Sequence, residues 1–149
     1  MNELTLKTCK VACAIAEVFK DIAKYSRILT IAGPGNNGGD ALVASRHLKY
    51  FGYDHIDILY PKPTTSPPLF PGLVAQLQDL DIPFVSSLPD NLSARYDLII
   101  DGIFGFSFNP GGGVRPPFDS ILKVLRDSTV PIVSIDIPSG EFWFCVTNH

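Results

Sequence analysis

Short apolar runs and helix-period segments alternate along this chain of 149 residues. The apolar runs are rich in isoleucine, leucine and valine and are bounded by glycine, proline or aspartate, a pattern typical of buried strands. We therefore expect strands at residues 27–32, 55–60, 83–85, 97–100 and 131–135.

Apolar residues recur at helical spacing between these runs. The first helix is expected over residues 2–25, with one apolar face. Further helices are expected over residues 40–50, 72–80 and 118–125, and a proline-rich loop over residues 61–71. The apolar face of the first helix consists of Val11, Ile15, Val18 and Ile22.

The alternation of strands with amphipathic helices predicts the fold class. It favours a Rossmann-like α/β fold, a three-layer αβα sandwich with a mostly parallel sheet. With 46% hydrophobic residues the chain is able to build a core, and its length suits one domain. We expect that domain over residues 1–140, followed by a divergent tail over residues 141–149.

Polar and glycine-rich segments follow three of the predicted strands. Residues 33–40 follow the first, residues 101–108 the fourth and residues 136–140 the last. Because the carboxyl ends of parallel strands meet at one edge of a sheet, these segments are predicted to form a single ligand crevice.

The segment Gly33-Pro-Gly-Asn-Asn-Gly-Gly-Asp40 joins a strand to a helix. Its glycines allow close approach to a ligand, and amides at a helix N-terminus favour anions such as phosphate. The spacing G-x-G-x-x-G is present, but a dinucleotide-binding dehydrogenase also needs an acid at the end of its second strand. Tyr60-Pro-Lys62 stands there instead, so a dehydrogenase is disfavoured.

Two carboxylates and a hydroxyl form the second candidate group. Asp101, Asp136 and Ser139 are suited to binding a hard cation or to moving protons. Capping a loop or helix is the alternative for each aspartate alone. The aromatic residues Phe104, Phe106 and Phe108 are candidates for stacking on a nicotinamide or adenine ring, or else for core packing.

Charge and composition exclude several classes. The net charge is −3 without a basic run, which argues against a nucleic-acid partner. No apolar stretch reaches the roughly 20 residues of a membrane span, and no signal peptide is evident. Three sparse cysteines favour a reducing compartment. We expect a cytoplasmic protein, with a mitochondrial location open for a form that carries a targeting segment.

The segments GPGNNGGD, DGIFGFSF and DIPSG, in that order after strands, resemble the NAD(P)H-hydrate epimerase family. This family is also called the YjeF N-terminal domain, and its vertebrate members are known as apolipoprotein A-I binding protein. The resemblance implies an isomerase that interconverts the R and S forms of hydrated NADH and NADPH (NADHX and NADPHX) in nicotinamide nucleotide repair. It also implies a dehydratase acting on the S form, and leaves a homodimer and an apolipoprotein-type partner open.

The resemblance also implies site residues. Potassium, one ion per subunit, would be held by Asn37, Asp101 and Ser139. Asp136 is the first candidate for proton transfer and Asp40 the second. The implied substrate contacts are Asn36, Asn37, Gly38, Gly39, Asp40, Gly105, Phe106, Ser107, Phe108, Asn109, Pro110, Gly111 and Asp136.

The chain also departs from the family pattern. Ala41 replaces the usual glycine, and residues 109–113 read Asn-Pro-Gly-Gly-Gly where relatives carry a shorter, charged stretch. After Gly140 the sequence EFWFCVTNH matches nothing in the family, which predicts a C-terminally truncated form without the last strands. Phe142, Trp143 and Phe144 are expected to cover some of the open edge. The alternative function is a catalytically inactive relative that serves as a protein-interaction or nucleotide-binding module.

Overall fold

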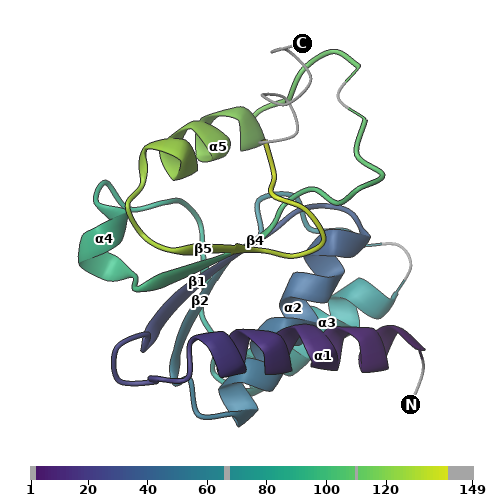
Figure 1. Ribbon diagram of the computed structural model, residues 1–149. Coiled ribbons are helices and arrows are strands. Elements are labelled where there is room, and N and C mark those ends of the chain that lie inside the picture. The colour runs from purple at the N-terminus through teal and green to yellow at the C-terminus, as the bar shows by residue number, and fades with distance from the viewer. Residues whose placement is uncertain (1–2, 66–67, 110, 141–149) are drawn as a thin grey trace.

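The computed structural model describes residues 3–65, 68–109 and 111–140 and contains a five-stranded sheet with helices on both sides (Figure 1). Every predicted strand forms. The strands are β1 (Arg27–Ala32), β2 (His55–Leu59), β3 (Phe84–Val85), β4 (Leu98–Gly102) and β5 (Ile132–Ser134). The helices are α1 (Glu3–Val18), α2 (Asn36–Tyr50), α3 (Leu69–Asp79), α4 (Leu92–Arg95) and α5 (Phe118–Asp127).

The strand order is β3-β2-β1-β4-β5, and each described pair is parallel. The chain therefore winds outward in one direction from β1 to β3 and in the other from β4 to β5. The order reverses between β1 and β4, which is where open sheets of this kind form a crevice at the carboxyl ends of their strands. The predicted α/β class and three-layer architecture are confirmed.

Alternate residues of the central strands enter two separate cores. Helices α1, α2 and α3 cover one face, where Ile28 of β1 packs with Leu42 of α2 and Leu77 of α3. Helix α5, with α4, covers the other face, which includes Leu29 of β1 and Phe118 of α5. Burial on both faces explains why the strands read as continuous apolar runs. In the described part of the chain, no helix combines the length and hydropathy that crossing a bilayer requires.

Helix boundaries differ from the prediction at several points. Helix α1 ends at Val18, which is 72% exposed, so the expected apolar face does not continue to Ile22. Just beyond this end, the hydroxyl of Tyr53 donates to the carbonyl of Phe19 (2.8 Å) and so satisfies an acceptor that the helix leaves open. Helix α3 starts before Pro71, since proline in a first helical turn gives up no intrahelical bond.

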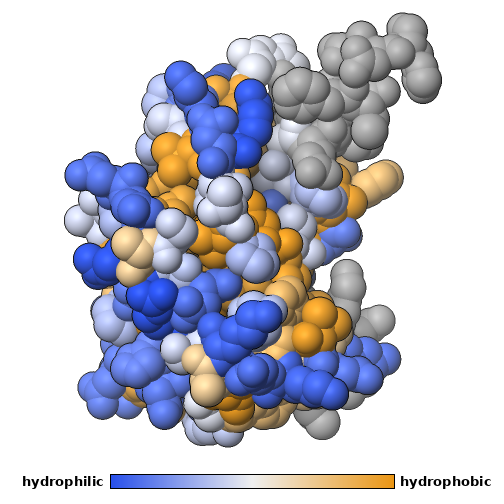
Figure 2. Space-filling model, turned by 60° about the vertical axis from the view of Figure 1, so that its left-hand side comes forward, coloured by the Kyte–Doolittle hydropathy of each residue, from blue (hydrophilic) through white to orange (hydrophobic). Residues whose placement is uncertain are grey.

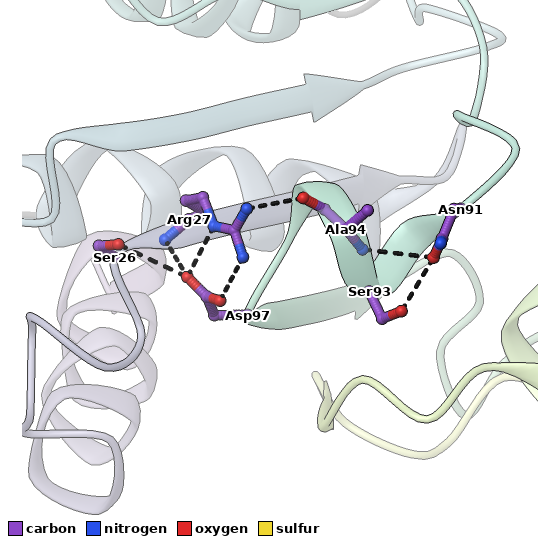
Figure 3. Close-up of polar contacts among 6 residues, drawn as sticks. All are labelled: Ser26, Arg27, Asn91, Ser93, Ala94 and Asp97. Carbon is purple, nitrogen blue, oxygen red and sulfur yellow. Dashed lines mark hydrogen bonds and ion pairs between the residues drawn. The ribbon is translucent and has the colours of Figure 1, made fainter.

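Helix α4 was not expected. It is a single short turn capped by Asn91, whose side chain accepts from the amide of Ala94 (3.3 Å). Figure 3 shows this turn beside the amino-terminal ends of β1 and β4, where the guanidinium of Arg27 contacts the carboxylate of Asp97 (2.8 Å) and the carbonyl of Ala94 (2.7 Å). The guanidinium holds the pKa of Asp97 below its usual value. These contacts tie the two strands together at the end opposite the crevice.

Candidate functional site

The carboxyl ends of β1, β4 and β5 meet in direct backbone contact. Ala32 pairs with Gly102, and Asp101 pairs with Ser134. The amide of Gly33 donates to the carbonyl of Gly102 (2.9 Å), and a Cβ on Gly33 would lie 1.8 Å from the carbonyl oxygen of Ile103. Only glycine at position 33 permits this approach. The three segments that sequence analysis assigned to one edge are therefore brought together.

The glycine-rich segment is part loop and part helix, because residues 33–35 join β1 to α2 and residues 36–40, expected to lie before the helix except for Asp40, already belong to α2. Helix α2 begins at Asn36, and its N-cap Gly35 makes no side-chain capping bond. A Cβ on Gly38 would lie 1.9 Å from the carbonyl oxygen of Gly33, so the first helical turn sits directly on the end of β1. Amides at such a terminus lack intrahelical acceptors and are available to an anion.

Glycine at position 102 accommodates the departure at position 41. A Cβ added to Gly102 would come within 2.3 Å of the Cβ of Ala41, which is fully buried. Helix α2 thus packs against the end of β4 through a contact between a methyl group and bare backbone. The family's usual glycine is not required at position 41 in this arrangement.

Asn37 and Asp136 approach the same backbone segment from two sides. The amide nitrogen Nδ2 of Asn37 donates to the carbonyl of Phe104 (3.1 Å). A Cβ on Gly105 would lie 3.4 Å from Cβ of Asn37 and 3.1 Å from Oδ2 of Asp136. Residues 104–105 therefore form a bridge between the start of α2 and the segment that follows β5.

Asp136 is exposed and has a left-handed backbone conformation, with φ of 73°. Its Oδ2 accepts a hydrogen bond from the amide of Phe106 (2.7 Å). A positive φ is uncommon for a residue with a side chain, and such strain concentrates where a fold must aim a functional group.

Asp101 is buried, with 2% of its surface exposed, and both of its carboxylate oxygens accept hydrogen bonds from the protein. Its Oδ1 accepts from the amide of Ile103 (3.1 Å), and its Oδ2 accepts from the amide of Ser139 (2.8 Å) and the hydroxyl of Ser134 (3.0 Å). The hydroxyl of Ser139 in turn accepts from the amide of Phe104 (3.0 Å). Asp101 therefore organises the loops after β4 and β5.

The three residues assigned to potassium converge on this region. Asn37 and Ser139 both contact the backbone of Phe104, and Ser139 contacts Asp101. Their carboxylate, amide and hydroxyl oxygens are the donor type that a hard cation prefers, so the residues fit the ion. No group of three His, Cys, Asp or Glu side chains with metal-binding geometry occurs among the described residues.

Asp40 has a different setting from Asp136. It is half-buried on α2, and its Oδ1 accepts from the hydroxyl of Thr8 on α1 (3.2 Å). Sequence analysis missed Thr8, because no local pattern reveals a contact across 32 positions. Thr8 thus links helix α1 to the first turns of α2.

The phenylalanines separate into two groups. The rings of Phe104 and Phe108 stack on each other with centroids 3.7 Å apart, and Phe104 also contacts Phe118 edge-on. Phe106 is 78% exposed, and its backbone amide donates a hydrogen bond to the carboxylate of Asp136. Core packing therefore applies to Phe104, whereas Phe106 is open to a ligand. Of the remaining predicted contacts, Asn36, Ser107, Asn109 and Gly111 are exposed, Gly38 and Gly39 are buried in α2, and Pro110 lies outside the described residues.

Comparison with known protein families identifies the family of the chain. The family described as YjeF-related protein N-terminus matches residues 8–141, which is nearly the whole chain. The chain belongs to this family. The match includes all three segments that form the crevice, so the family assignment and the site geometry concern the same residues.

Individual relatives agree with this assignment. A crystal structure of yeast ynu0, YNL200c, superposes with a TM-score of 0.81 at 37% sequence identity, covering 92% of this chain and 60% of that one. The Arabidopsis thaliana protein named pyridoxine/pyridoxamine 5'-phosphate oxidase 1, chloroplastic, is 51% identical over 148 residues, covering 92% of this chain. The chain spans only 27% of that relative's length.

Proposed function

We propose that this YjeF-family domain epimerises the R and S forms of hydrated NADH and NADPH. The observation that carries the proposal is the carboxylate of Asp136, exposed on a strained backbone and facing a bridge to the start of α2. Family membership supports the same reaction class. The proposal concerns the region that the chain shares with its longer relatives, and not the further activities of those proteins.

Asp136 would move the proton in this reaction. Inverting the hydrated carbon requires the hydroxyl to leave or the ring to open, and then closure from the other face, so a group must deliver and remove a proton. The amide of Phe106 holds one carboxylate oxygen, Oδ2, which orients the group while Oδ1 has no bond to a described residue. Asp40 is the weaker candidate because Thr8 already donates to it.

The start of α2 would hold the phosphates of the substrate. Gly35 leaves the helix without a side-chain cap, and the helix dipole and open amides favour negative charge there. Phe106 would stack on the nicotinamide ring, since its ring is exposed and its amide bonds to Asp136. The remaining substrate contacts assigned from sequence stay predictions.

Potassium would be held by Asn37, Asp101 and Ser139. When bound, the ion supplies positive charge that offsets the aspartates and the substrate phosphates. The protein's own contribution is the hydrogen-bond network around Phe104, which positions the loop after β4. A shift of thermal unfolding by potassium chloride that exceeds the shift by sodium chloride, and is lost in Asn37→Ala, would support this assignment.

The decisive test is epimerisation of R-form NADPH hydrate with potassium, coupled to an S-specific dehydratase. Asp136→Asn is the best variant, because asparagine tolerates a positive φ and keeps an oxygen for the amide of Phe106. We expect a loss of roughly 100- to 10,000-fold. Asp81→Asn is the matched control, since Asp81 is also exposed with a positive φ of 57° but lies away from the crevice. Full activity of a folded Asp136→Asn protein would rule out this role.

The name of the Arabidopsis relative suggests a second phosphate ester as a competitor. Pyridoxine 5'-phosphate offers the same anionic group to the start of α2, so it belongs in the binding assay. Tighter binding of this ester than of NADPHX, with no epimerisation, would contradict the proposed substrate. Binding of NADPHX without turnover would favour the inactive nucleotide-binding module. A homodimer, an apolipoprotein-type partner and a cytoplasmic location stay predictions.

A further inference from the structure

The loop after β2 is tied to the glycine-rich segment that leads into α2. The hydroxyl of Thr64 donates to the carbonyl of Pro34, and the amide of Thr64 donates to the hydroxyl of Tyr60 (3.0 Å). Tyr60 directly follows β2 and is buried, with 7% of its surface exposed. A Cβ on Gly39 would lie 2.7 Å from Cε1 of Phe70, so the start of α3 also packs on the first turns of α2. The loop therefore has a defined position beside the proposed phosphate site.

Lys62 in this loop is the one charged residue between Asp57 and Asp79. It is exposed, and it forms no ion pair with any residue that the structure describes. The carboxylate of Asp57 accepts from the hydroxyl of Tyr96 (2.8 Å) and lines a separate pocket at the amino-terminal ends of the strands. No acid in this segment therefore offsets the charge of Lys62 at the carboxyl end of β2.

The order of the strands determines which part of a dinucleotide this loop would meet. Strand β1 has β2 on one side and β4, then β5, on the other. The proposed phosphate site follows β1, and the proposed contacts to the nicotinamide end, Phe106 and Asp136, follow β4 and β5. A dinucleotide that crosses the carboxyl edge in this order extends its adenosine half over the end of β2.

The flank beside β5 is less suited to a phosphate. Leu122 and Leu125 of α5 and Ile132 of β5 line a groove of about 710 Å³ there, and Arg126 in its lining is already engaged in another interaction. On the face drawn in Figure 2, hydrophobic surface forms a band across the middle, between hydrophilic residues above and below. A phosphate against apolar surface loses its hydration and gains no charged partner in return. The loop after β2 is thus the better place for an anionic end.

We propose that Lys62 binds the 2'-phosphate on the adenosine ribose of the substrate, so that this chain prefers NADPHX to NADHX. The inference rests on the proposed function and specifies which of its two substrates the site favours. The two hydrates differ only in this phosphate, and a phosphate monoester carries roughly 1.5 to 2 negative charges at neutral pH. Dinucleotide sites that select the free 2'-hydroxyl place an acid at the end of the second strand, and those that accept the phosphate place a cation nearby. In this chain the acid is missing and Lys62 supplies the cation.

The test compares ligands that differ only in the 2'-phosphate. The dehydratase-coupled assay gives kcat/KM for R-form NADPHX and R-form NADHX, and calorimetry gives the affinities for adenosine 2',5'-bisphosphate and adenosine 5'-monophosphate. Lys62→Gln removes the charge, and Lys62→Arg retains it. Lys123→Gln is the matched control, since Lys123 is also exposed but lies on α5, which covers the other face of the sheet.

We expect the wild type to prefer NADPHX, and Lys62→Gln to lower this preference roughly 3- to 20-fold. Lys62→Arg and Lys123→Gln should keep the preference. The preference for the bisphosphate over the monophosphate should change in parallel and weaken in added salt, because an exposed ion pair is screened.

Two results would overturn the proposal: a preference that is unchanged in Lys62→Gln, or a wild type that does not bind the bisphosphate more tightly than the monophosphate. Failure of the proposed function would give a different result. A protein that epimerises neither hydrate, but prefers the bisphosphate in a manner that depends on Lys62, would support the 2'-phosphate site and refute the epimerase activity.

Discussion

Replacing Asp101 by alanine is expected to destabilise the fold far more than its single side chain suggests. The carboxylate accepts from the amides of Ile103 and Ser139 and from the hydroxyl of Ser134, at 2.8 to 3.1 Å. A buried donor left without an acceptor costs about 1–3 kcal/mol. The hydroxyl is able to rotate to another partner, so two stranded amides dominate. We expect a loss of about 3–5 kcal/mol in the free energy of unfolding, a large share of the roughly 5–15 kcal/mol of a typical domain.

The measurement is urea unfolding followed by circular dichroism, in buffer without potassium so that only bonds within the protein contribute. Ser134→Ala is the control, because it removes one hydroxyl donor and leaves the carboxylate both amides. Its expected cost is about 1 kcal/mol. An Asp101→Ala cost no greater than that of Ser134→Ala, at unchanged dependence on urea, would refute the role assigned to the buried carboxylate.

Three further predictions address the glycine contacts, the aromatic residues and the ion pair at the opposite end. Gly33→Ala is expected to unfold or strongly destabilise the protein in a thermal melt, because the added Cβ would lie 1.8 Å from the backbone of Ile103. A Cβ at Gly72 in α3 meets nothing within 4 Å, so Gly72→Ala should raise the free energy of unfolding by up to about 1 kcal/mol. Phe106→Ala should raise the KM for NADPHX without lowering the melting temperature, because the ring of Phe106 is exposed. Phe108→Ala should lower the melting temperature, because the ring of Phe108 stacks on that of Phe104 with centroids 3.7 Å apart. The reverse result would contradict the assignment of these rings. The pKa of Asp97 is lowered in the folded protein, so its ionised form stabilises the fold fully above the unfolded-state pKa of about 3.9, and this contribution is lost as the pH falls through the lower folded value. The difference in stability between wild type and Asp97→Asn should therefore shrink below about pH 4 in acid titrations. A difference that does not depend on pH would contradict this role of Asp97.

Buried segments were the part of the fold that sequence pattern could predict. The strand at 27–32 is apolar on both faces, and the structure buries it between two cores. The helical spacing of Phe118, Ile121, Leu122 and Leu125 gave the inner face of α5 correctly, since all four residues are buried. Both predictions succeeded because burial selects residue types with the period of the element.

The remaining features depend on contacts that local pattern does not contain. Helix α2 starts at Asn36, although two glycines in its first turns lower helix propensity, because its glycines allow it to pack directly on β1. Helix α4 is too short to show a period. The contact of Thr8 with Asp40 joins two helices and leaves no local signature. The predicted end of α1 at residue 25 was wrong, since the helix ends at Val18, close to the carbonyl of Phe19 that the distant Tyr53 contacts.

The candidate site brings together residues near positions 37, 104 and 136, which lie far apart along the chain. No fragment of the unfolded polypeptide contains all three, so a small molecule that binds there has no comparable site in the denatured ensemble. By mass action such a molecule stabilises the entire native sheet and not a single loop, by about 2.7 kcal/mol at one hundred times its dissociation constant. The supply of ligand thereby becomes a determinant of how much folded protein exists.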